Sequence, residues 1–285
     1  MSSLARRVTT GALLAVLAAG LLYADGKSAP GWVPFYTAVV LSVLSALELA
    51  RMGSLVQHRI GLGLLLSATG AALPPLAGLV HHSTVTPRIM ATWYALCISL
   101  VMLFDIVGLF QALAGKEEKQ ERGRWAIGLA LWVFPALFML VPLGIRYGTG
   151  GLVLLVILSK IGDIFGYFVG RKIGKRHPFP NLSPGKTLAG CVASFVAGCA
   201  AGAVVTPMFF PDDTVFAGWI SGALLGAGLN LSAQAGDLAE SWVKRRTGVK
   251  DSSSWVGAAG GVLDVVDSVL FTAPTAVFLW PLVVG

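Results

Sequence analysis

Carboxylates and basic side chains gather in the second half of this sequence, where apolar runs begin or end. Asp264 and Asp267 are three residues apart, which places both on one face of a helix, directly after the pair Gly260-Gly261. Asp237 and Glu240 repeat this spacing. Hard divalent cations bind carboxylate oxygens, and Mg²⁺ typically uses one or two carboxylates together with substrate phosphates. The aspartates therefore indicate a metal-assisted reaction of phosphates.

Basic residues flank these aspartates and would neutralise bound phosphates. Lys244 and Arg245 follow Asp237 along the chain, and Lys250-Asp251 precedes the glycine pair. A set of surface ion pairs is the alternative. That alternative does not explain why the last two aspartates enter an apolar run that continues to the C-terminus.

The segment NLSPGKTLAG, 181–190, is a second polar cluster, at the predicted start of an apolar helix. A P-loop would need a glycine five residues before Gly185, where the chain has Pro180, so that motif is excluded. A helix N-terminus beside Lys186 and the Thr187 hydroxyl would suit a phosphate group. A capped helix start with an interfacial lysine is the alternative that stays open.

A third cluster, SKIGDIFGYFVGRKIGKR, covers 159–176. Lys160 and Asp163 are three residues apart, so Asp163 is either the partner of this lysine or part of a site. Gly166 and Gly170 form a G-x-x-x-G pair, which predicts the close approach of another helix.

The elements that must position these clusters are membrane spans. The chain has 285 residues, of which 55% are hydrophobic and 12% charged, whereas soluble domains carry about 25% charged residues. About 20 apolar residues suffice for one helical span. We therefore predict an all-α, polytopic membrane protein with nine spans. Their approximate ranges are 8–24, 32–50, 60–80, 89–114, 125–144, 149–170, 188–210, 214–235 and 262–284.

The basic residues predict the orientation of these spans. Counting the odd-numbered connections as cytoplasmic places most of the 21 Lys and Arg residues on that side, as the positive-inside rule requires. The N-terminus is then inside, the C-terminus outside, and the three polar clusters cytoplasmic. The net charge of +7 is explained by topology, so nucleic acid is not expected as a partner. We expect a multi-pass protein of the inner (plasma) membrane.

The polar chemistry divides the chain into a membrane region at 1–148, with spans 1–5, and a catalytic membrane region at 149–285, with spans 6–9 and their cytoplasmic loops. Glu48 and Asp105 are the ionisable residues within the spans of the first region. Glu48 lies three residues before Arg51, so local pairing is its expected role.

The order of the motifs resembles that of a known family. S-W-V-K-R-R-T-G-V-K-D at 241–251, followed by A-G-G-V-L-D-V-V-D-S at 259–268, resembles the signature of phosphatidate cytidylyltransferases, also called CDP-diacylglycerol synthases. D-I-F-G-Y-F-V-G-R at 163–171, S-P-G-K-T at 183–187 and G-D-L-A-E-S at 236–241 are similar to further motifs of that family. The resemblance covers about 150–285.

The resemblance implies that CTP and phosphatidate react to give CDP-diacylglycerol and pyrophosphate at the bilayer surface. It implies that Asp237 and Asp264 bind Mg²⁺, with a second cation and a homodimer left open. The remaining polar residues of these motifs have expected roles as well. Lys250, Asp251 and Asp267 are expected to be catalytic, and Asp163, Ser183, Lys186, Thr187, Ser241, Lys244 and Arg245 are expected to bind substrate or phosphate.

The chain departs from the family signature at two positions. Ala259 stands at the position of the histidine, and Val265 at that of the arginine between the two aspartates. These departures remove two polar contacts beside the expected metal site. Since the aspartates and lysines persist, we expect an active enzyme, and a catalytically impaired relative is the alternative.

Two other functions fit parts of the pattern. A CTP-dependent kinase acting on a polyprenol-type lipid would have similar spans and the same nucleotide. A transporter could line an ion path with intramembrane aspartates, but it would be expected to show inverted repeats, and we find no convincing internal repeat.

Overall fold

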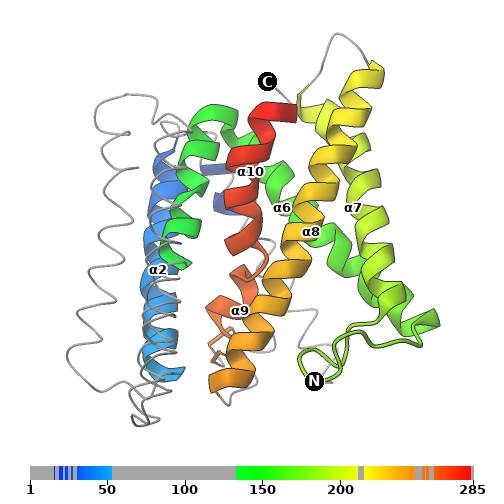
Figure 1. Cartoon of the computed structure of the whole chain (residues 1–285). Coiled ribbons are helices and arrows are strands. Elements are labelled where there is room, and N and C mark those ends of the chain that lie inside the picture. The colour runs from blue at the N-terminus through cyan, green and yellow to red at the C-terminus, as the bar shows by residue number, and fades with distance from the viewer. Residues whose placement is uncertain are drawn as a thin grey trace, which may run out of the picture. The chain divides into compact units, whose positions relative to one another are not determined.

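The computed structural model describes residues 31–52, 133–210, 215–247 and 260–283, together with isolated positions at 16–27 and 252–256. Within these ranges the chain forms helices and connections, and no strand (Figure 1). The helices are α2 (Trp32–Met52), α6 (Leu140–Ile173), α7 (Leu188–Phe209), α8 (Val215–Thr247), α9 (Val262–Val266) and α10 (Val269–Val283).

Four helical stretches of the described chain are long and apolar enough to cross a membrane. They are Trp32–Leu49, Val133–Ile173, Leu188–Phe209 and Val262–Val283. The described residues are thus all-helical and have several apolar spans, as a polytopic membrane protein requires. The total of nine spans and the orientation stay predictions.

The observed helices follow the expected spans with two differences. The part of the expected span 125–144 that the structure describes, from residue 133 onward, and the expected span 149–170 fall within one helical stretch, Val133–Ile173. In this stretch Gly148 has the non-helical angles φ 61° and ψ −165°. Glycine reaches this backbone region without the clash that a Cβ would cause. The span expected at 214–235 is the beginning of α8, which continues to Thr247 and is not among the four apolar stretches. The spans expected at 60–80 and 89–114, and most of 8–24, lie outside the described residues.

The described residues belong to two compact units. The first contains Met1–Arg146 and Arg246–Val266, and the second contains Tyr147–Arg245 and Asp267–Gly285. In the first unit, α2 contacts α9 and the Phe35 and Phe138 rings lie 5.7 Å apart. In the second unit, Ser159 of α6 donates a hydrogen bond to Thr272 of α10 over 2.9 Å. The expected division of function at 148 stays a prediction.

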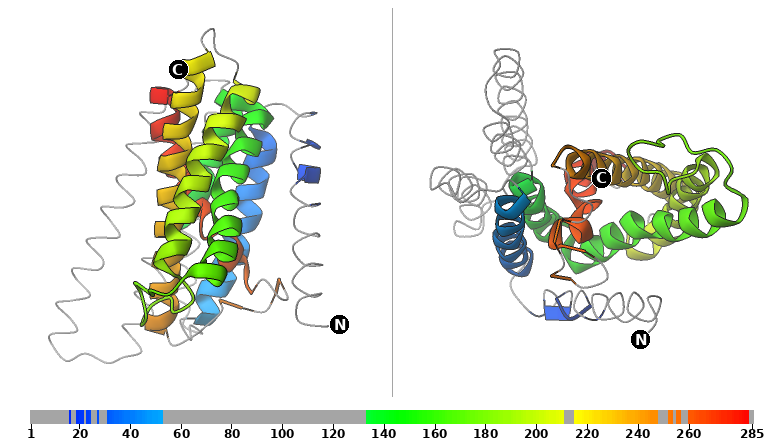
Figure 2. Two further views of the ribbon diagram at one scale, coloured as in Figure 1. Left: turned by 90° about the vertical axis from the view of Figure 1, so that its right-hand side faces the viewer. Right: turned by 90° about the horizontal axis from the view of Figure 1, so that it is seen from below.

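Within the second unit, glycines let α7 and α8 approach with their backbones in contact. The two helices run side by side in Figures 1 and 2. A Cβ added at Gly202 would overlap the Gly222 carbonyl oxygen and lie 2.8 Å from the Gly226 Cα. Small residues of this kind are what membrane helices use for close packing.

The G-x-x-x-G pair of α6 serves the same purpose against the start of α7. A Cβ added at Gly166 would lie 3.1 Å from the Gly190 carbonyl oxygen, and one at Gly170 would lie 3.4 Å from the Gly190 Cα. The predicted close approach of another helix is therefore confirmed. It brings the loop before α7 against the end of α6.

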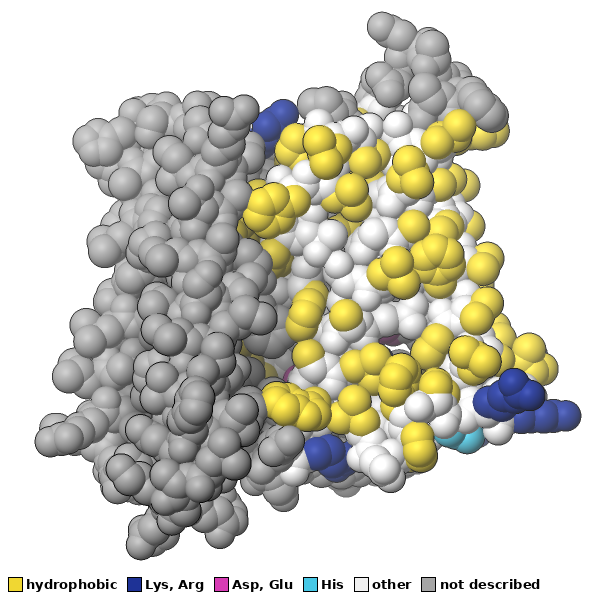
Figure 3. Space-filling view, viewed as in Figure 1, with side chains coloured by type: hydrophobic (Ala, Val, Ile, Leu, Met, Phe, Trp, Pro, Cys, Tyr) yellow, Lys and Arg dark blue, Asp and Glu magenta, His cyan; other side chains and the backbone are white. Residues whose placement is uncertain are grey.

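The surface of the helices is apolar along most of its length. Figure 3 shows hydrophobic side chains over much of the described face, with most of the visible Lys and Arg side chains near its lower edge. Trp219, Leu224 and Leu231 of α8 are 54%, 58% and 57% exposed. Such exposure suits contact with lipid tails.

Replacing Gly202 with alanine should lower the thermal stability of the purified protein. Alanine at a helical glycine would otherwise stabilise by about 1 kcal/mol, but here the added methyl group overlaps the backbone of α8 and overpacking costs about 1–3 kcal/mol. The measurement is the unfolding midpoint in detergent. Gly20→Ala is the control, because Gly20 is helical and has no atom within 4 Å of its added Cβ. An unchanged midpoint for Gly202→Ala would contradict the packing described here.

Candidate active site

A polar pocket of about 230 Å³ lies in the second unit, among α6, the loop before α7, α7 itself and α8. It brings together four residues that the sequence predicted for the site, although they come from three separate motifs. The lining residues are Gly162, Asp163, Gly166, Tyr167, Gly185, Lys186, Thr187, Gly190, Cys191, Ser194, Gln234 and Asp237.

The ion pair between Lys186 and Asp237 is the central polar contact of this pocket. The Lys186 Nζ lies 3.2 Å from the Asp237 carboxylate, and the two side chains are 24% and 21% exposed. Both remain open enough for a ligand to reach them. An incoming phosphate could therefore compete with Asp237 for the lysine.

The loop before α7 places Lys186 by local hydrogen bonds. The Lys186 backbone N–H donates to the Ser183 carbonyl over 3.1 Å, which closes a Ser-Pro-Gly-Lys turn. His177 Nδ1 donates to the Pro184 carbonyl over 2.8 Å. Thr187 is buried and caps α7 by accepting from the Gly190 N–H over 3.1 Å. Thr187 thus has the capping role that the sequence left open, and it also lines the pocket.

Further carboxylates of the unit surround Asp237. Asp237 interacts electrostatically with both Asp163 and Asp267, and its carboxyl group lies within hydrogen-bonding reach of that of Asp267. Lys160 pairs with Asp267 at 3.6 Å. Three carboxyl groups and two lysines therefore lie together in this part of the unit.

This donor set fits a hard divalent cation. In the described part of the chain, no three His, Cys, Asp or Glu side chains are close enough to enclose a metal ion by themselves. Mg²⁺ does not require such a cage, because it typically uses one or two carboxylates with water and substrate phosphates. Carboxylates that face one another beside a phosphate-sized pocket are compatible with that mode of binding.

Three polar residues form a network that links α7 to α8, and two of them, Ser194 and Gln234, line the pocket. Asn230 is 1% exposed and donates from its amide nitrogen to the Ser194 hydroxyl over 3.1 Å. Gln234 donates to the Asn230 side-chain oxygen over 2.7 Å. Neither Asn230 nor Ser194 was predicted from the sequence. An asparagine within an apolar helix was the signal that could have revealed this network.

Three predicted residues lie farther along α8 and do not line the pocket. They are Ser241, Lys244 and Arg245. Lys244 pairs with Glu240 at 2.9 Å, one helical turn away, as the spacing predicts. Arg245 is exposed.

Asp264 belongs to the first unit, where backbone groups hold its carboxylate. It accepts hydrogen bonds from the Ser252 N–H over 3.1 Å and from the Gly261 N–H over 2.7 Å. Gly260 has a φ of 88°, and a side chain there would overlap the Asp264 carboxylate. The pairing of Asp264 with Asp237 in one metal site stays a prediction. Lys250, Asp251 and Ala259 lie outside the described residues.

Comparison with curated proteins identifies relatives that share these motifs. The protein YnbB of Escherichia coli, named as uncharacterized, is 35% identical over 150 residues, which cover 53% of this chain and 47% of YnbB. A phosphatidate cytidylyltransferase of Aquifex aeolicus is 30% identical over 190 residues, which cover 66% of this chain and 68% of that enzyme. The enzyme of that name from Chlamydia trachomatis is 38% identical over 128 residues, which cover 43% and 40% of the two chains. Apart from the Aquifex enzyme, these matches span about half of the relatives' length or less.

The family comparison covers almost the whole chain. Residues 5–283 match the Cytidylyltransferase family, and the match includes every residue of the polar pocket. This protein therefore belongs to the Cytidylyltransferase family.

Proposed function

We propose that this protein transfers the cytidylyl group of CTP to phosphatidate, which yields CDP-diacylglycerol and pyrophosphate. The observation that carries the proposal is the pocket in which Asp163, Lys186 and Asp237 meet from three motifs. Relatives named phosphatidate cytidylyltransferase support the choice of substrates.

The reaction joins two anions. A phosphate oxygen of phosphatidate attacks the α-phosphorus of CTP and forms the new P–O–P link. The bond from that phosphorus to the oxygen bridging to the β-phosphate breaks, and pyrophosphate leaves with the electron pair. Phosphatidate is largely ionised at neutral pH, so the site does not need a strong general base. Its main tasks are to align the reactants and to neutralise charge.

Lys186 is placed for the second of these tasks. Its ammonium group lies at the pocket and is held there by Asp237 in the free protein. A bound triphosphate would offer the lysine a more highly charged partner. Lys244 and Arg245, and Lys250 by prediction, would extend this positive charge toward the lipid phosphate and the pyrophosphate.

Asp237 and Asp264 are the proposed Mg²⁺ ligands. The ion, when bound, would screen the phosphates of CTP and polarise the α-phosphate. Asp163 and Asp267 place further carboxyl oxygens beside Asp237, which adds acceptors for the water molecules or donors around a bound ion. Ala259 and Val265 stand where the family has a histidine and an arginine. The lysines and the metal ion bound by the aspartates would therefore neutralise the phosphates without those two side chains.

The membrane location follows from the substrates. Phosphatidate presents its phosphate at the bilayer surface, whereas CTP arrives from water. The polar pocket lies where the loop before α7 meets the ends of apolar helices, and this junction suits both reactants. We propose that it faces the cytoplasm, on the inner (plasma) membrane of the cell.

The first test is incorporation of labelled CTP into lipid by the purified protein with phosphatidate and Mg²⁺. Incorporation should require phosphatidate, stop on chelation of the metal and return with added Mg²⁺. Asp237→Asn and Asp264→Asn should each lower kcat by about 100-fold or more, a typical loss when charge stabilisation is removed. Lys186→Gln should mainly raise KM for CTP.

Ser232→Ala is the matched control on the helix that carries Asp237. Ser232 shares a 2.7 Å hydrogen bond with Thr275 and does not line the pocket. This variant should retain the wild-type rate. A folded wild-type protein that incorporates no label, or an Asp237→Asn variant with full activity, would overturn the proposal.

A further inference from the structure

Glu48 is an intramembrane carboxylate that the reaction scheme above does not use. It lies in α2, within the apolar stretch Trp32–Leu49, and it is 0% exposed. Burying an ionised carboxylate is costly unless several hydrogen bonds compensate. The sequence suggested Arg51 as its partner, but the Arg51 side chain lies outside the described part of the chain. Among the described residues, Glu48 has four hydrogen-bond donors.

All four donors come from the segment that precedes Asp264 or begins α9. The Ser253 hydroxyl and the Val262 N–H donate to Oε1 over 2.6 and 2.7 Å. The Ser252 hydroxyl and the Leu263 N–H donate to Oε2 over 3.0 and 2.9 Å. Each carboxylate oxygen thus accepts two hydrogen bonds. An ionised carboxylate, which only accepts, matches this arrangement fully.

The same segment holds Asp264. The Ser252 residue that donates its hydroxyl to Glu48 also donates its N–H to the Asp264 carboxylate. Gly261 donates to Asp264 over 2.7 Å, and a Cβ at Gly261 would lie 2.7 Å from the Glu48 Oε2. Glu48 and Asp264 therefore contact the same backbone segment, and both accept hydrogen bonds from Ser252.

We infer that Glu48 is a positioning residue that fixes the Asp264 carboxylate for metal binding. The inference rests on the proposed function, and it assigns a role to the N-terminal region, where the sequence indicated none. Groups that orient a metal ligand typically change metal affinity or activity by about 10- to 100-fold when they are lost. Loss of the Glu48 carboxylate should therefore weaken metal binding by Asp264.

The test compares Glu48→Gln with Glu48→Asp. Glutamine keeps the shape but turns one acceptor into a donor that would face the hydroxyl and N–H donors of the segment. We expect Glu48→Gln to raise the half-saturating Mg²⁺ concentration and to lower kcat, each by about tenfold or more, with KM for CTP within about twofold. Excess Mg²⁺ should recover part of the rate. Glu48→Asp, which remains an acceptor, should retain more activity than Glu48→Gln.

Hydrogen exchange provides a measurement that does not depend on turnover. The Val262 and Leu263 amides should exchange faster in Glu48→Gln than in the wild type, without substrate or metal. An inactive wild type would refute the proposed function, while the exchange result would still report whether Glu48 holds the segment.

Ser45→Ala is the matched control. Ser45 is also buried in α2, one turn before Glu48, and its hydroxyl has no hydrogen-bond partner among the described residues. It should leave exchange and Mg²⁺ dependence unchanged. Wild-type exchange and Mg²⁺ dependence in Glu48→Gln would overturn the inference, and so would equal effects in Ser45→Ala.

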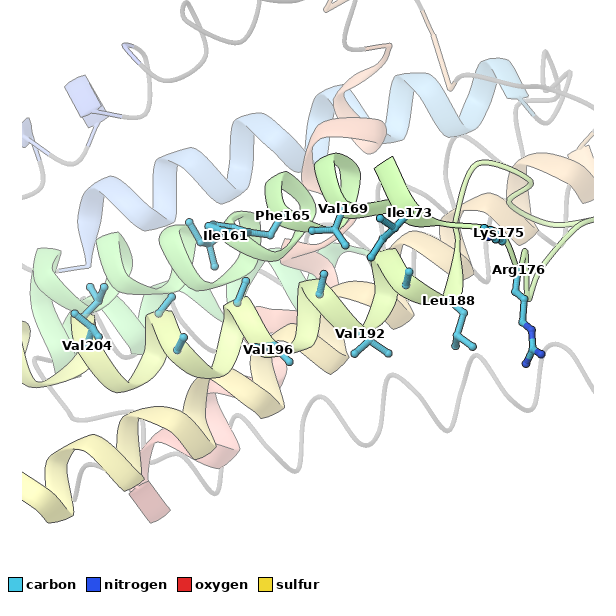
Figure 4. Close-up of a pocket in the computed structure, with 16 residues that line it drawn as sticks. Ile161, Phe165, Val169, Ile173, Lys175, Arg176, Leu188, Val192, Val196 and Val204 are labelled. Atoms are coloured by element: carbon cyan, nitrogen blue, oxygen red, sulfur yellow. The ribbon is translucent and has the colours of Figure 1, made fainter. Parts of the chain in front are cut away.

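A separate observation concerns the outer surface of α6 and α7. These helices form a groove of about 1040 Å³ whose lining shares no residue with the polar pocket (Figure 4). Phe165 and Val169 of α6 and Val192 and Val196 of α7 are among its walls, and all of its lining residues except two are apolar.

The two exceptions are cations at one end of the groove. Figure 4 shows Lys175 and Arg176 beyond Ile173 and Leu188, where α6 ends and α7 begins. Both side chains are exposed, and neither forms an ion pair with a carboxylate in the described part of the chain. The Arg176 carbonyl accepts from the Leu188 N–H over 2.8 Å, which anchors the cationic end to α7.

From this charge pattern we propose that the groove binds an anionic phospholipid. The acyl chains would lie along the apolar walls, and the lipid phosphate would contact Lys175 and Arg176. Arginine can bind a phosphate through two parallel hydrogen bonds, and a neighbouring lysine adds a second charge. Zwitterionic lipids would bind less tightly at the same position, because the positive charge of their headgroup is repelled by Lys175 and Arg176.

Native mass spectrometry of the protein released from bilayers of equal phosphatidylglycerol and phosphatidylcholine content tests this site. Neither lipid is the proposed substrate. The wild type should retain phosphatidylglycerol over phosphatidylcholine, and Lys175→Gln/Arg176→Gln should reduce that preference by about tenfold, given the usual contribution of basic residues at an anionic surface.

The control removes the same charge nearby. Arg171→Gln/Lys172→Gln changes two exposed cations at the end of α6 that do not line the groove. It should leave the preference intact. Three outcomes would overturn the proposal: no preference in the wild type, an equal loss in the control, or a two-chain species that the Lys175/Arg176 variant abolishes. The last would show that a second copy occupies the groove.

Discussion

Backbone contact between glycines is the constraint on which the polar site depends. Gly166 and Gly190 let α6 meet the start of α7, and Gly202 with Gly226 lets α7 meet α8. Larger residues would separate these helices by the width of their side chains. Asp163, Lys186 and Asp237 could not then line one small pocket. Packing in the apolar part of the helices therefore sets the distances between charged groups at their ends.

The carboxylates of this protein differ in how their charge is compensated. Glu48 receives four hydrogen bonds and is fully buried, which is the arrangement of a fixed structural anion. Asp237 has a lysine at 3.2 Å but keeps other carboxylates close by. Both oxygens of Glu48 are fully supplied with hydrogen-bond donors, whereas Asp237 lies among other carboxyl groups and lines a pocket that a ligand can enter. This difference separates a residue that shapes the protein from residues that bind ligands.

Local patterns in the sequence predicted the features that depend on spacing along one helix. The start and end of α7 were expected within one residue, and the close approach at Gly166 and Gly170 was expected from their separation. The end of α8 was missed by 12 residues, because charged side chains end an apolar run but not a helix. Hydropathy reports where lipid contact stops, and backbone hydrogen bonding continues beyond it.

Contacts between distant segments were not predictable in this way. Asp163, Lys186 and Asp237 could be grouped through the motifs of a known family, but no spacing rule joins them. The donors to Glu48 lie more than 200 residues away in the sequence. The spacing along α2 suggested only Arg51, and that pairing stays a prediction. Asn230 and Ser194 were missed because each looks ordinary in its own helix, and only packing makes them neighbours.

The central claim is that the nucleotide is transferred through its α-phosphorus. The most direct measurement supplies phosphatidate with CTP labelled at either the α- or the γ-phosphorus and follows each label. We expect the α-label to enter the lipid and the γ-label to be released as pyrophosphate. Recovery of the γ-label in the lipid, with CDP as the other product, would show a lipid kinase and contradict this claim.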